Sequence, residues 1–239
     1  MGHVLAGALA ARGDGVAILG RPEADAHDPA AFDGAEVVID FSRGDAVPGN
    51  VTQALAAGCR RLVIGTSGWD AERAPVARML TDAGAAGVWG ASFSIGVTLF
   101  MGLVEEAAGR FGRFEAYDPF VVEWHRSAKI DRPSGTAQEI ARRLVAAHPR
   151  KRVVGEPTGR RSPEELDVTS VRAGASPGMH LVGFDAPGET LELRLTARDR
   201  SAYAAGATAA ADWLLAEPRP AGLHPFESVI ADLASAPEE

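Results

Sequence analysis

The sequence predicts an α/β protein, with a doubly wound parallel sheet and a second α+β domain inserted into it. The first observation is that short, apolar, β-branched runs alternate with helical patterns in the N-terminal part of the chain. The second is that glycines stand at the ends of these runs. The third is that the pattern changes after residue 96, where one long helix is followed by a group of strands.

The predicted strands of the parallel sheet are continuous apolar runs. Such runs are typical of strands that are buried on both faces. They are, the last being the weakest, Val16–Leu19, Val37–Phe41, Leu62–Gly65 and Gly87–Gly90. Helices are expected near residues 46–57 and 70–83. The chain starts at Met1-Gly2-His3, which the pattern places inside the first helix.

The second domain is expected to span residues 96–199, and residues 1–95 with 200–239 are expected to form the first. It begins with a helix from Val97 to Phe111 that is apolar on one face. Further strands are predicted at residues 114–124, 167–173, 179–185 and 189–197, with helices at 135–147 and 201–215. Ala186-Pro187-Gly188 is typical of a hairpin turn, so this sheet should be mixed or antiparallel. Residues 217–222 break the last helix.

Composition excludes several classes of protein. The chain has 239 residues, of which 46% are hydrophobic, and its net charge of −8 argues against a nucleic-acid-binding protein. Its single cysteine, Cys59, can form no internal disulfide and fits a reducing cytoplasm. No run of about 20 apolar residues could span a membrane, and no signal peptide is evident. No metal site is expected, because the histidines show no ligand spacing.

A basic island stands out in this acidic chain. His125 ends an apolar strand, and Arg126, Lys129 and Arg132 follow it against a single acid, Asp131. Such a cluster indicates a local anion site. A titratable imidazole near a fixed cation suits the protonation of a carbanion-like product, and the cations should lower the pKa of His125. Whether His125 or Lys129 donates the proton stays open.

A helix start follows the basic island. Thr136 and Glu139 have the spacing of a capping box, so a helix is expected to begin there. Free N–H groups at such a terminus bind carboxylates or phosphates, and Gly135 would let a ligand approach the backbone. Together with Arg126 and Lys129, this segment predicts a site for a small anion.

Three predicted strands end in polar segments at the same edge of the parallel sheet. These are Asp40-Phe41-Ser42, Gly65-Thr66-Ser67-Gly68 and residues 91–96. Nucleotides bind at this edge in doubly wound sheets, so the three segments predict a shared cofactor site. A Rossmann sheet should open with a strand and a glycine-rich turn, of which only Gly2 would remain here.

The ordered set of motifs resembles the dihydrodipicolinate reductase (4-hydroxy-tetrahydrodipicolinate reductase) family. Its substrate loop, E-x-H-H-x-x-K-x-D-x-P-S-G-T-A, matches Glu123, His125, Lys129, Asp131, Pro133, Ser134, Gly135, Thr136 and Ala137. Its strand ends D-F-T, V-I-G-T-T-G-F and N-F-S-x-G-V resemble residues 40–42, 63–69 and 92–97. A later pattern matches Arg172, Gly174, Gly178, His180 and Phe184. The resemblance runs from about residue 2 to residue 215.

The resemblance implies a Rossmann-like dinucleotide-binding domain, interrupted by a domain for substrate binding and oligomerisation, in a cytoplasmic homotetramer. It implies hydride transfer from NADH or NADPH to 4-hydroxy-tetrahydrodipicolinate, a small dicarboxylate, with loss of water, in lysine and diaminopimelate biosynthesis. The implied catalytic residues are His125 and Lys129, and the implied substrate-binding residues are Arg126, Ser134, Gly135 and Thr136. The implied cofactor-binding residues are Gly65, Thr66, Ser67, Ala91, Ser92, Phe93, Ser94, Arg21 and Arg200.

Several positions depart from the family pattern. Arg126 replaces a second histidine, Ser92 replaces an asparagine, and Leu195 replaces another histidine. Arginine can still bind a carboxylate bidentately. The missing first strand leads us to expect that the true start lies upstream, and that Met1 is an internal residue of the glycine-rich turn. The rival hypothesis is a genuine chain with impaired cofactor binding.

The sequence leaves the cofactor and two other functions open. No acidic residue stands immediately after Leu19 to bind a ribose diol, and Arg21 could contact a 2′-phosphate, which favours NADPH. One alternative is a related oxidoreductase, such as an amino-acid dehydrogenase, with a different substrate. The other is a non-catalytic ligand-binding homologue. The pairing of His125 with Lys129 favours catalysis, because a binding protein needs only the cations.

Overall fold

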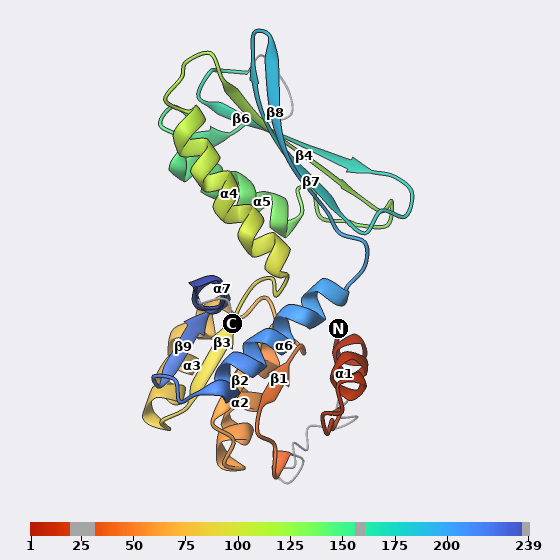
Figure 1. The fold of residues 1–239 in the computed structure, drawn as a ribbon, viewed down its shortest axis with the longest axis vertical. Helices are drawn as coiled ribbons and strands as arrows, with labels where there is room; N and C mark the ends of the chain where they lie inside the picture. Colours follow the sequence, from red (N-terminus) through yellow and green to blue (C-terminus); the bar gives the residue numbers. More distant parts are fainter. Residues whose placement is uncertain (20–31, 156–160, 236–239) are drawn as a thin grey trace. The chain divides into compact units, whose positions relative to one another are not determined.

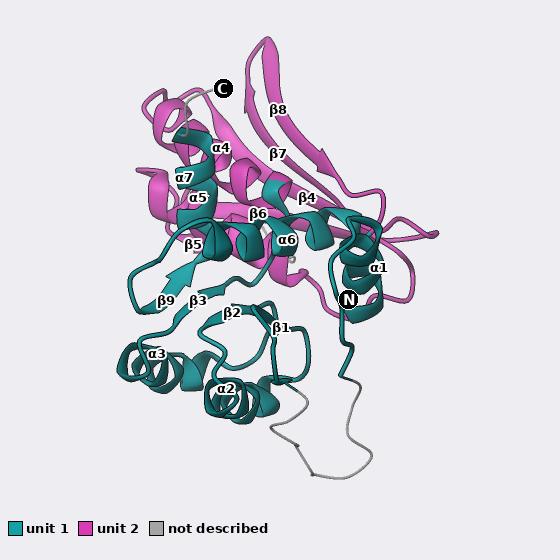
Figure 2. Ribbon diagram, turned by 60° about the horizontal axis from the view of Figure 1, so that its bottom comes forward, with its two compact units in different colours: residues 1–95, 200–239 teal, residues 96–199 magenta. Residues whose placement is uncertain are grey.

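The computed structural model describes residues 1–19, 32–155 and 161–235. The chain separates into two compact units, and Figure 2 shows them in different colours. Unit 1 comprises Met1–Ile95 and Arg200–Glu239, and unit 2 comprises Gly96–Asp199. None of the helices in the described ranges is long and apolar enough to cross a membrane.

Unit 1 contains, among its described residues, a four-stranded parallel sheet in the order β1-β2-β3-β9. The strands are β1 (Val38–Asp40), β2 (Arg61–Ile64), β3 (Ala86–Trp89) and β9 (Gly222–Pro225). The helices, labelled in Figure 1, are α1 (Gly2–Ala11), α2 (Val47–Ala56), α3 (Arg73–Asp82), α6 (Ser201–Ala216) and α7 (Phe226–Ser235). Short 3-10 turns at Gly44–Ala46 and Asp70–Glu72 precede α2 and α3.

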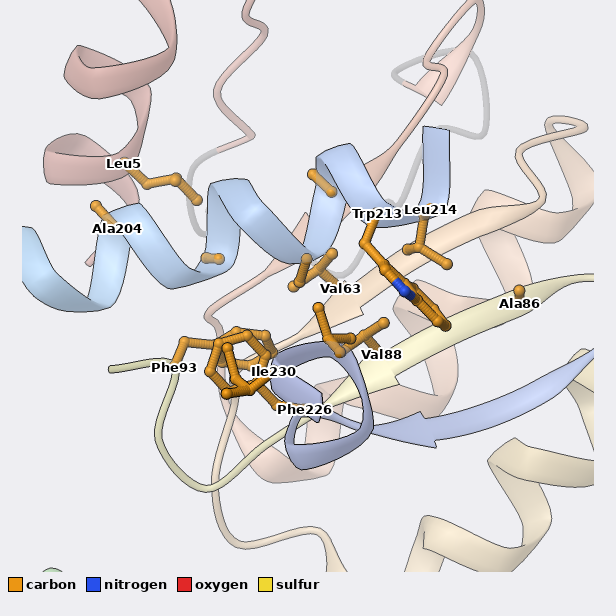
Figure 3. Close-up of a cluster of buried hydrophobic side chains, with 14 residues drawn as sticks. Leu5, Val63, Ala86, Val88, Phe93, Ala204, Trp213, Leu214, Phe226 and Ile230 are labelled. Atoms are coloured by element: carbon orange, nitrogen blue, oxygen red, sulfur yellow. The ribbon is translucent and has the colours of Figure 1, made fainter. Parts of the chain in front are cut away.

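Both faces of this sheet are covered, as expected for a doubly wound fold. On one face Val63 and Val88 pack with residues of α1, α6 and α7, including Leu5, Leu214 and Phe226 (Figure 3). On the other face Leu62 and Ile64 pack with α2 and α3. Neighbouring residues of β2 therefore point to opposite, buried sides, which explains its unbroken apolar sequence.

The strand predicted at Val16–Leu19 is wrong. Residues 14–19, all of which the structure describes, form no strand. The side chains of Val16, Ile18 and Leu19 are 39%, 55% and 51% exposed. A strand is stabilised by bonds to a neighbour, and none of the described strands pairs with this segment. Its apolar pattern alone could not supply that neighbour.

The C-terminal end adds two elements that the sequence did not predict. β9 starts at Gly222, within the segment expected only to break a helix, and pairs in parallel with β3. α7 then buries Phe226, Val229 and Ile230 in the core shown in Figure 3. The helices α2, α3 and α6 begin and end within three residues of the predicted bounds.

Unit 2 is built, over the described residues, on a five-stranded mixed sheet in the order β5-β6-β4-β7-β8. The strands are β4 (Asp118–His125), β5 (Val153–Val154), β6 (Glu165–Arg172), β7 (Met179–Ala186) and β8 (Glu189–Thr196). β4 pairs in parallel with β6 and antiparallel with β7, so the sheet is mixed, the first of the two predicted forms. The predicted hairpin turn joins β7 to β8 at Gly188, whose φ is +102°.

Two helices cover one face of this sheet, α4 (Ile95–Phe111) and α5 (Gly135–Ala147) (Figure 1). Val104 and Leu144 from the helices pack on Val121 and Val182 from the strands. β4 is shorter than predicted: residues 114–117 form no strand, and Phe114 is exposed. The important consequence is that β4 ends at His125, at the start of the predicted substrate loop.

Candidate active site

Strand β4 carries polar residues on its buried face. Side chains alternate along a strand, and in β4 those of Val121, Glu123 and His125 point to the buried side. Glu123 has no exposed surface at all. A carboxylate on the core face of a strand needs partners, and β6 and the start of α5 supply them.

One carboxylate oxygen of Glu123 accepts three hydrogen bonds. Oε1 accepts from the backbone N–H of Ser134 at 2.9 Å, from Ser170 Oγ at 2.6 Å and from Arg172 Nη2 at 2.6 Å. Burial opposes ionisation of Glu123, but these bonds outweigh it and lower the pKa to about 2. The site therefore contains a buried negative charge at neutral pH.

Two imidazoles face the other oxygen of Glu123. His125 Nδ1 lies 3.1 Å from Oε2, and His180 Nε2, on β7 directly across from Glu123, lies 3.9 Å from it. Burial is the main cause that lowers the pKa of His125, and Lys129 and Arg172 lower it further. The predicted direction is confirmed, although burial contributes more than the cations.

The pKa of His180 is also lowered, mainly by burial. Burial lowers it to about 4, with a smaller contribution from His125, and Ser134 Oγ lies 3.3 Å from its Nε2. Both imidazoles are thus neutral at pH 7. Neutral rings can accept a proton on one nitrogen while they donate from the other.

The stability of the fold should therefore fall in mild acid. A histidine with a pKa of 6.5 when unfolded and about 4 when folded stabilises the fold fully above pH 6.5. Its contribution is lost as pH falls from 6.5 to 4, by about 3 kcal/mol for His180. His148, also buried and with a pKa lowered to about 4, acts in the same direction. Denaturant unfolding at pH 7 and pH 4.5 measures the difference.

Two variants test whether His180 causes this pH dependence of stability. His180→Asn should make the unfolding free energy less dependent on pH, because a titrating group is removed. His3→Asn, at an exposed position of α1, should leave the dependence unchanged. Equal curves for His180→Asn and the unsubstituted chain would contradict the assignment.

The loop after β4 carries the cations. Lys129 Nζ pairs with Asp131 Oδ1 at 2.9 Å, and its side chain is 23% exposed. Arg126 is exposed, and its backbone N–H donates to Ser176 O at 2.8 Å, which anchors the loop to the turn before β7. The basic island thus follows His125 directly at the end of the sheet.

The helix start differs from the prediction in its capping residue. Ser134, not Thr136, caps α5: its Oγ accepts from Ala137 N at 3.2 Å. The predicted capping box is wrong because Glu123 holds the Ser134 N–H in place, and Glu139 instead pairs with Arg142 and Arg143. In the described part of the chain, no hydrogen bond engages the backbone N–H groups of Gly135 and Thr136.

The predicted cofactor residues of the first two strand ends meet in unit 1. Asp40 Oδ1 accepts from Thr66 Oγ1 at 2.8 Å and from Ser42 N at 2.8 Å, so the ends of β1 and β2 are tied together. Thr66 is consequently buried, whereas Ser67 is exposed. Gly65 packs so closely on the ring of Phe41 that an added Cβ would lie 2.2 Å from it.

The third strand end contributes residues of two kinds. After β3, Ala91 is exposed and Ser92 half-buried, while the Phe93 side chain lies in the core against Phe226, with ring centroids 4.7 Å apart (Figure 3). The Phe93 side chain is therefore not available to a ligand, and Ser94 is buried. Arg200 is exposed and occupies the N-cap position of α6 without a side-chain capping bond, and Arg21 lies outside the described residues.

Sequence reasoning missed the cluster around Glu123. Glu123, His125 and His180 bring three potential metal-ligand atoms within 4.8 Å of one another, although no ligand spacing links them in the sequence. The pairing of β4 with β7 creates this proximity. The sequence did contain one signal for this cluster: Glu123 lies two residues before His125, so both side chains are on the same face of the strand.

Comparison with known proteins agrees along nearly the whole chain. The family model for the N-terminus of dihydrodipicolinate reductase matches residues 6–93, and the model for its C-terminus matches residues 96–230. The 4-hydroxy-tetrahydrodipicolinate reductase of Halorhodospira halophila is 36% identical over 236 residues, which cover 94% of this chain and 82% of that protein. That of Chromobacterium violaceum is 38% identical over 192 residues, covering 77% and 70%.

A solved structure shows the same fold. The dihydrodipicolinate reductase from Paenisporosarcina sp. TG-14, bound to dipicolinate, matches with a TM-score of 0.65 and 22% identity, over 81% of this chain and 73% of that one. The two family models follow each other in the order of the two halves of the reductase and leave few residues unmatched. This chain therefore belongs to the dihydrodipicolinate reductase family.

Proposed function

We propose that this protein reduces 4-hydroxy-tetrahydrodipicolinate to tetrahydrodipicolinate, with loss of water, in lysine and diaminopimelate biosynthesis. One observation carries the proposal. A neutral His125, the Lys129 ammonium that acts electrostatically on it, and the free N–H groups that begin α5 all belong to one segment of unit 2. These are the groups needed to bind a carboxylate and to deliver a proton beside it.

Substrate binding rests on the first turn of α5 and on Arg126. The N–H groups of Gly135 and Thr136 lie at the positive end of a 13-residue helix and would bind one carboxylate. The exposed guanidinium of Arg126 would bind a carboxylate bidentately. The related reductase bound to dipicolinate, a planar dicarboxylate, supports this substrate class.

Lys129 is the proposed proton donor. Burial and nearby cations hold His125 in its neutral form at pH 7, so His125 has no spare proton to give unless it first takes one. Lys129 is partly exposed, so a proton that it gives up can be replaced from solvent. His125 would accept or relay protons at its free ring nitrogen.

The strand ends of unit 1 fit a nicotinamide cofactor. Glycine and small polar residues follow β2 and β3, and exposed Ser67 and Ala91 leave the backbone open to a ligand. When bound, the reduced nicotinamide supplies the hydride. We propose NADPH as the preferred form, since Arg21 follows Leu19 closely in the sequence and could contact a 2′-phosphate. A cytoplasmic homotetramer completes the proposal.

Arg126 should act in binding rather than in chemistry. Charged hydrogen bonds contribute about 1.5–3 kcal/mol, so Arg126→Ala should raise KM for the dicarboxylate roughly 10- to 100-fold while kcat changes little. Arg132→Ala, at an exposed position of the same loop, is the matched control and should leave KM nearly unchanged. A fall in kcat at constant KM in Arg126→Ala would contradict the assigned role.

Cofactor oxidation at 340 nm tests the proposed function. The substrate is generated in situ from aspartate semialdehyde and pyruvate, and the chain is assayed beside a version extended with the sequence encoded upstream. We expect substrate-dependent oxidation of NADPH, faster than that of NADH. Folded protein that binds dipicolinate but oxidises neither cofactor in either version would overturn the proposal.

A further inference from the structure

We infer that Glu123 is a positioning residue that holds His125 in a single tautomer, with its proton on Nδ1 and its Nε2 lone pair free. The inference deepens the proposed function, on which its catalytic consequence rests. The two carboxylate oxygens of buried Glu123 have different surroundings: Oε1 accepts three hydrogen bonds, and Oε2 accepts none from any residue that the structure describes.

The Oε1 side of Glu123 is committed to donors. Ser134 N, Ser170 Oγ and Arg172 Nη2 all donate to Oε1 at 2.6–2.9 Å. The three donors come from the start of α5 and from β6, and the Arg172 side chain is almost as buried as Glu123. Only an acceptor can occupy this position, and the orientation of the carboxylate is therefore set.

The imidazole of His125 is the donor nearest to Oε2 of Glu123 among the described residues. Among the described residues, neither Oε2 nor His125 Nδ1 has a hydrogen-bond partner, yet the two buried atoms lie 3.1 Å apart. Leaving a buried carboxylate oxygen without a donor costs about 1–3 kcal/mol or more. A small rotation of the ring, with the proton on Nδ1, would satisfy both atoms at once.

The opposite side of the His125 ring is kept clear by a glycine. A Cβ at Gly178 would lie 3.0 Å from Nε2 and 3.3 Å from Cδ2. Gly178 has a φ of +154°, a backbone conformation that residues with a side chain rarely adopt, so the position suits glycine. With the Nδ1 proton directed at Glu123, Nε2 is the nitrogen left to accept a proton during the reaction.

The charges around the cluster favour this role over a metal site. The groups that act on His125 are Glu123, Lys129, Asp131, Arg172 and His180. Two of them are fixed cations, and Arg172 already binds the other oxygen of Glu123. A divalent cation placed between Glu123 and the imidazoles would be repelled by the positive charges of Lys129 and Arg172. A neutral imidazole would not be repelled by them.

The tautomer can be observed directly by ¹⁵N NMR of histidine-labelled protein at pH 7.5. We expect the His125 resonances, identified by their absence in His125→Asn, to show a protonated Nδ1 and an unprotonated Nε2. The measurement needs neither cofactor nor substrate, so it tests the inference even if the proposed function is wrong. A protonated Nε2 in the unsubstituted chain would overturn it.

Glu123→Gln should invert the tautomer. Because three donors face the Oε1 position, the amide must place its oxygen there and its NH₂ group toward His125. Nδ1 then accepts, and the ring proton moves to Nε2. We expect kcat to fall about 10²-fold or more, with KM for the dicarboxylate changed little. The kinetic pKa of His125 should also move to lower pH, because a neighbouring negative charge is removed.

Two control variants separate positioning from folding. Ser170→Ala removes a donor from Oε1 but leaves the charge and Oε2 in place, so the Nδ1 tautomer should persist. Glu123→Asp should also retain that tautomer and restore part of kcat. An unchanged tautomer in folded Glu123→Gln, or one zinc ion per chain that is lost in His180→Ala, would overturn the inference. If Glu123→Gln does not fold, the spectrum of the unsubstituted chain decides.

Discussion

Replacing Lys129 by alanine is expected to lower kcat by about 10²-fold or more, the usual effect of losing a positioned general acid. The neutral His125 cannot take over at pH 7, because burial and Arg172 keep its pKa low. Steady-state rates with saturating NADPH and dicarboxylate measure the loss. Removing the partner of Lys129 by Asp131→Asn should have a much smaller effect on kcat.

Lys129→Arg decides whether Lys129 supplies a proton or only a charge. A guanidinium keeps the positive charge but does not release a proton near neutral pH. If Lys129 donates the proton, Lys129→Arg should restore binding of the dicarboxylate while kcat stays low. Recovery of kcat in Lys129→Arg would show that the charge alone matters, and the assigned role would be wrong.

Among glycine-to-alanine substitutions in the described core, Gly206→Ala is expected to cause the largest loss of stability. Gly206 lies in α6, where a Cβ would be 1.7 Å from the carbonyl oxygen of Phe93 and 3.0 Å from Phe226 Cζ. The nearest atoms belong to backbone, which cannot rotate away as a side chain could. We expect a loss of about 3 kcal/mol, or roughly 6–12 °C in Tm.

Gly102→Ala in α4 is the matched control. An added Cβ there has no atom within 4 Å, so it introduces no clash. Alanine stabilises a helix by about 1 kcal/mol relative to glycine, and Tm should rise slightly. Thermal unfolding of both variants separates helix propensity from packing. A Tm of Gly206→Ala equal to that of the unsubstituted chain would contradict the close packing of α6 on the segment after β3.

Strands could be predicted where an apolar sequence pattern coincides with a neighbouring strand that pairs with it. β2 has apolar residues on both faces because helices cover both, and its sequence shows this directly. Val16–Leu19 has the same kind of sequence but no neighbour among the described strands. β9 is the opposite case: Gly222–Pro225 has little strand signal and is formed by its pairing with β3. Pairing between distant segments is what the local pattern lacks.

Within the candidate site, the proximity of residues from one segment could be predicted from the sequence, whereas the proximity of residues brought together by the sheet could not. His125, Lys129 and the start of α5 are neighbours in sequence, so their association could be inferred. Ser170 and Arg172 lie 47 and 49 residues from Glu123, and only the pairing of β6 with β4 places them beside it. Ser134 rather than Thr136 caps α5, since Glu123 of β4 accepts a hydrogen bond from the Ser134 N–H.

Transfer of deuterium from [4-²H]NADPH to the product tests the central claim most directly. The chain is incubated with labelled cofactor and with 4-hydroxy-tetrahydrodipicolinate generated in situ, and the product is analysed by mass spectrometry. We expect tetrahydrodipicolinate that carries one deuterium from one face of the nicotinamide and has lost one water. Cofactor oxidation without deuterium in this product, or label in a different acid, would contradict it.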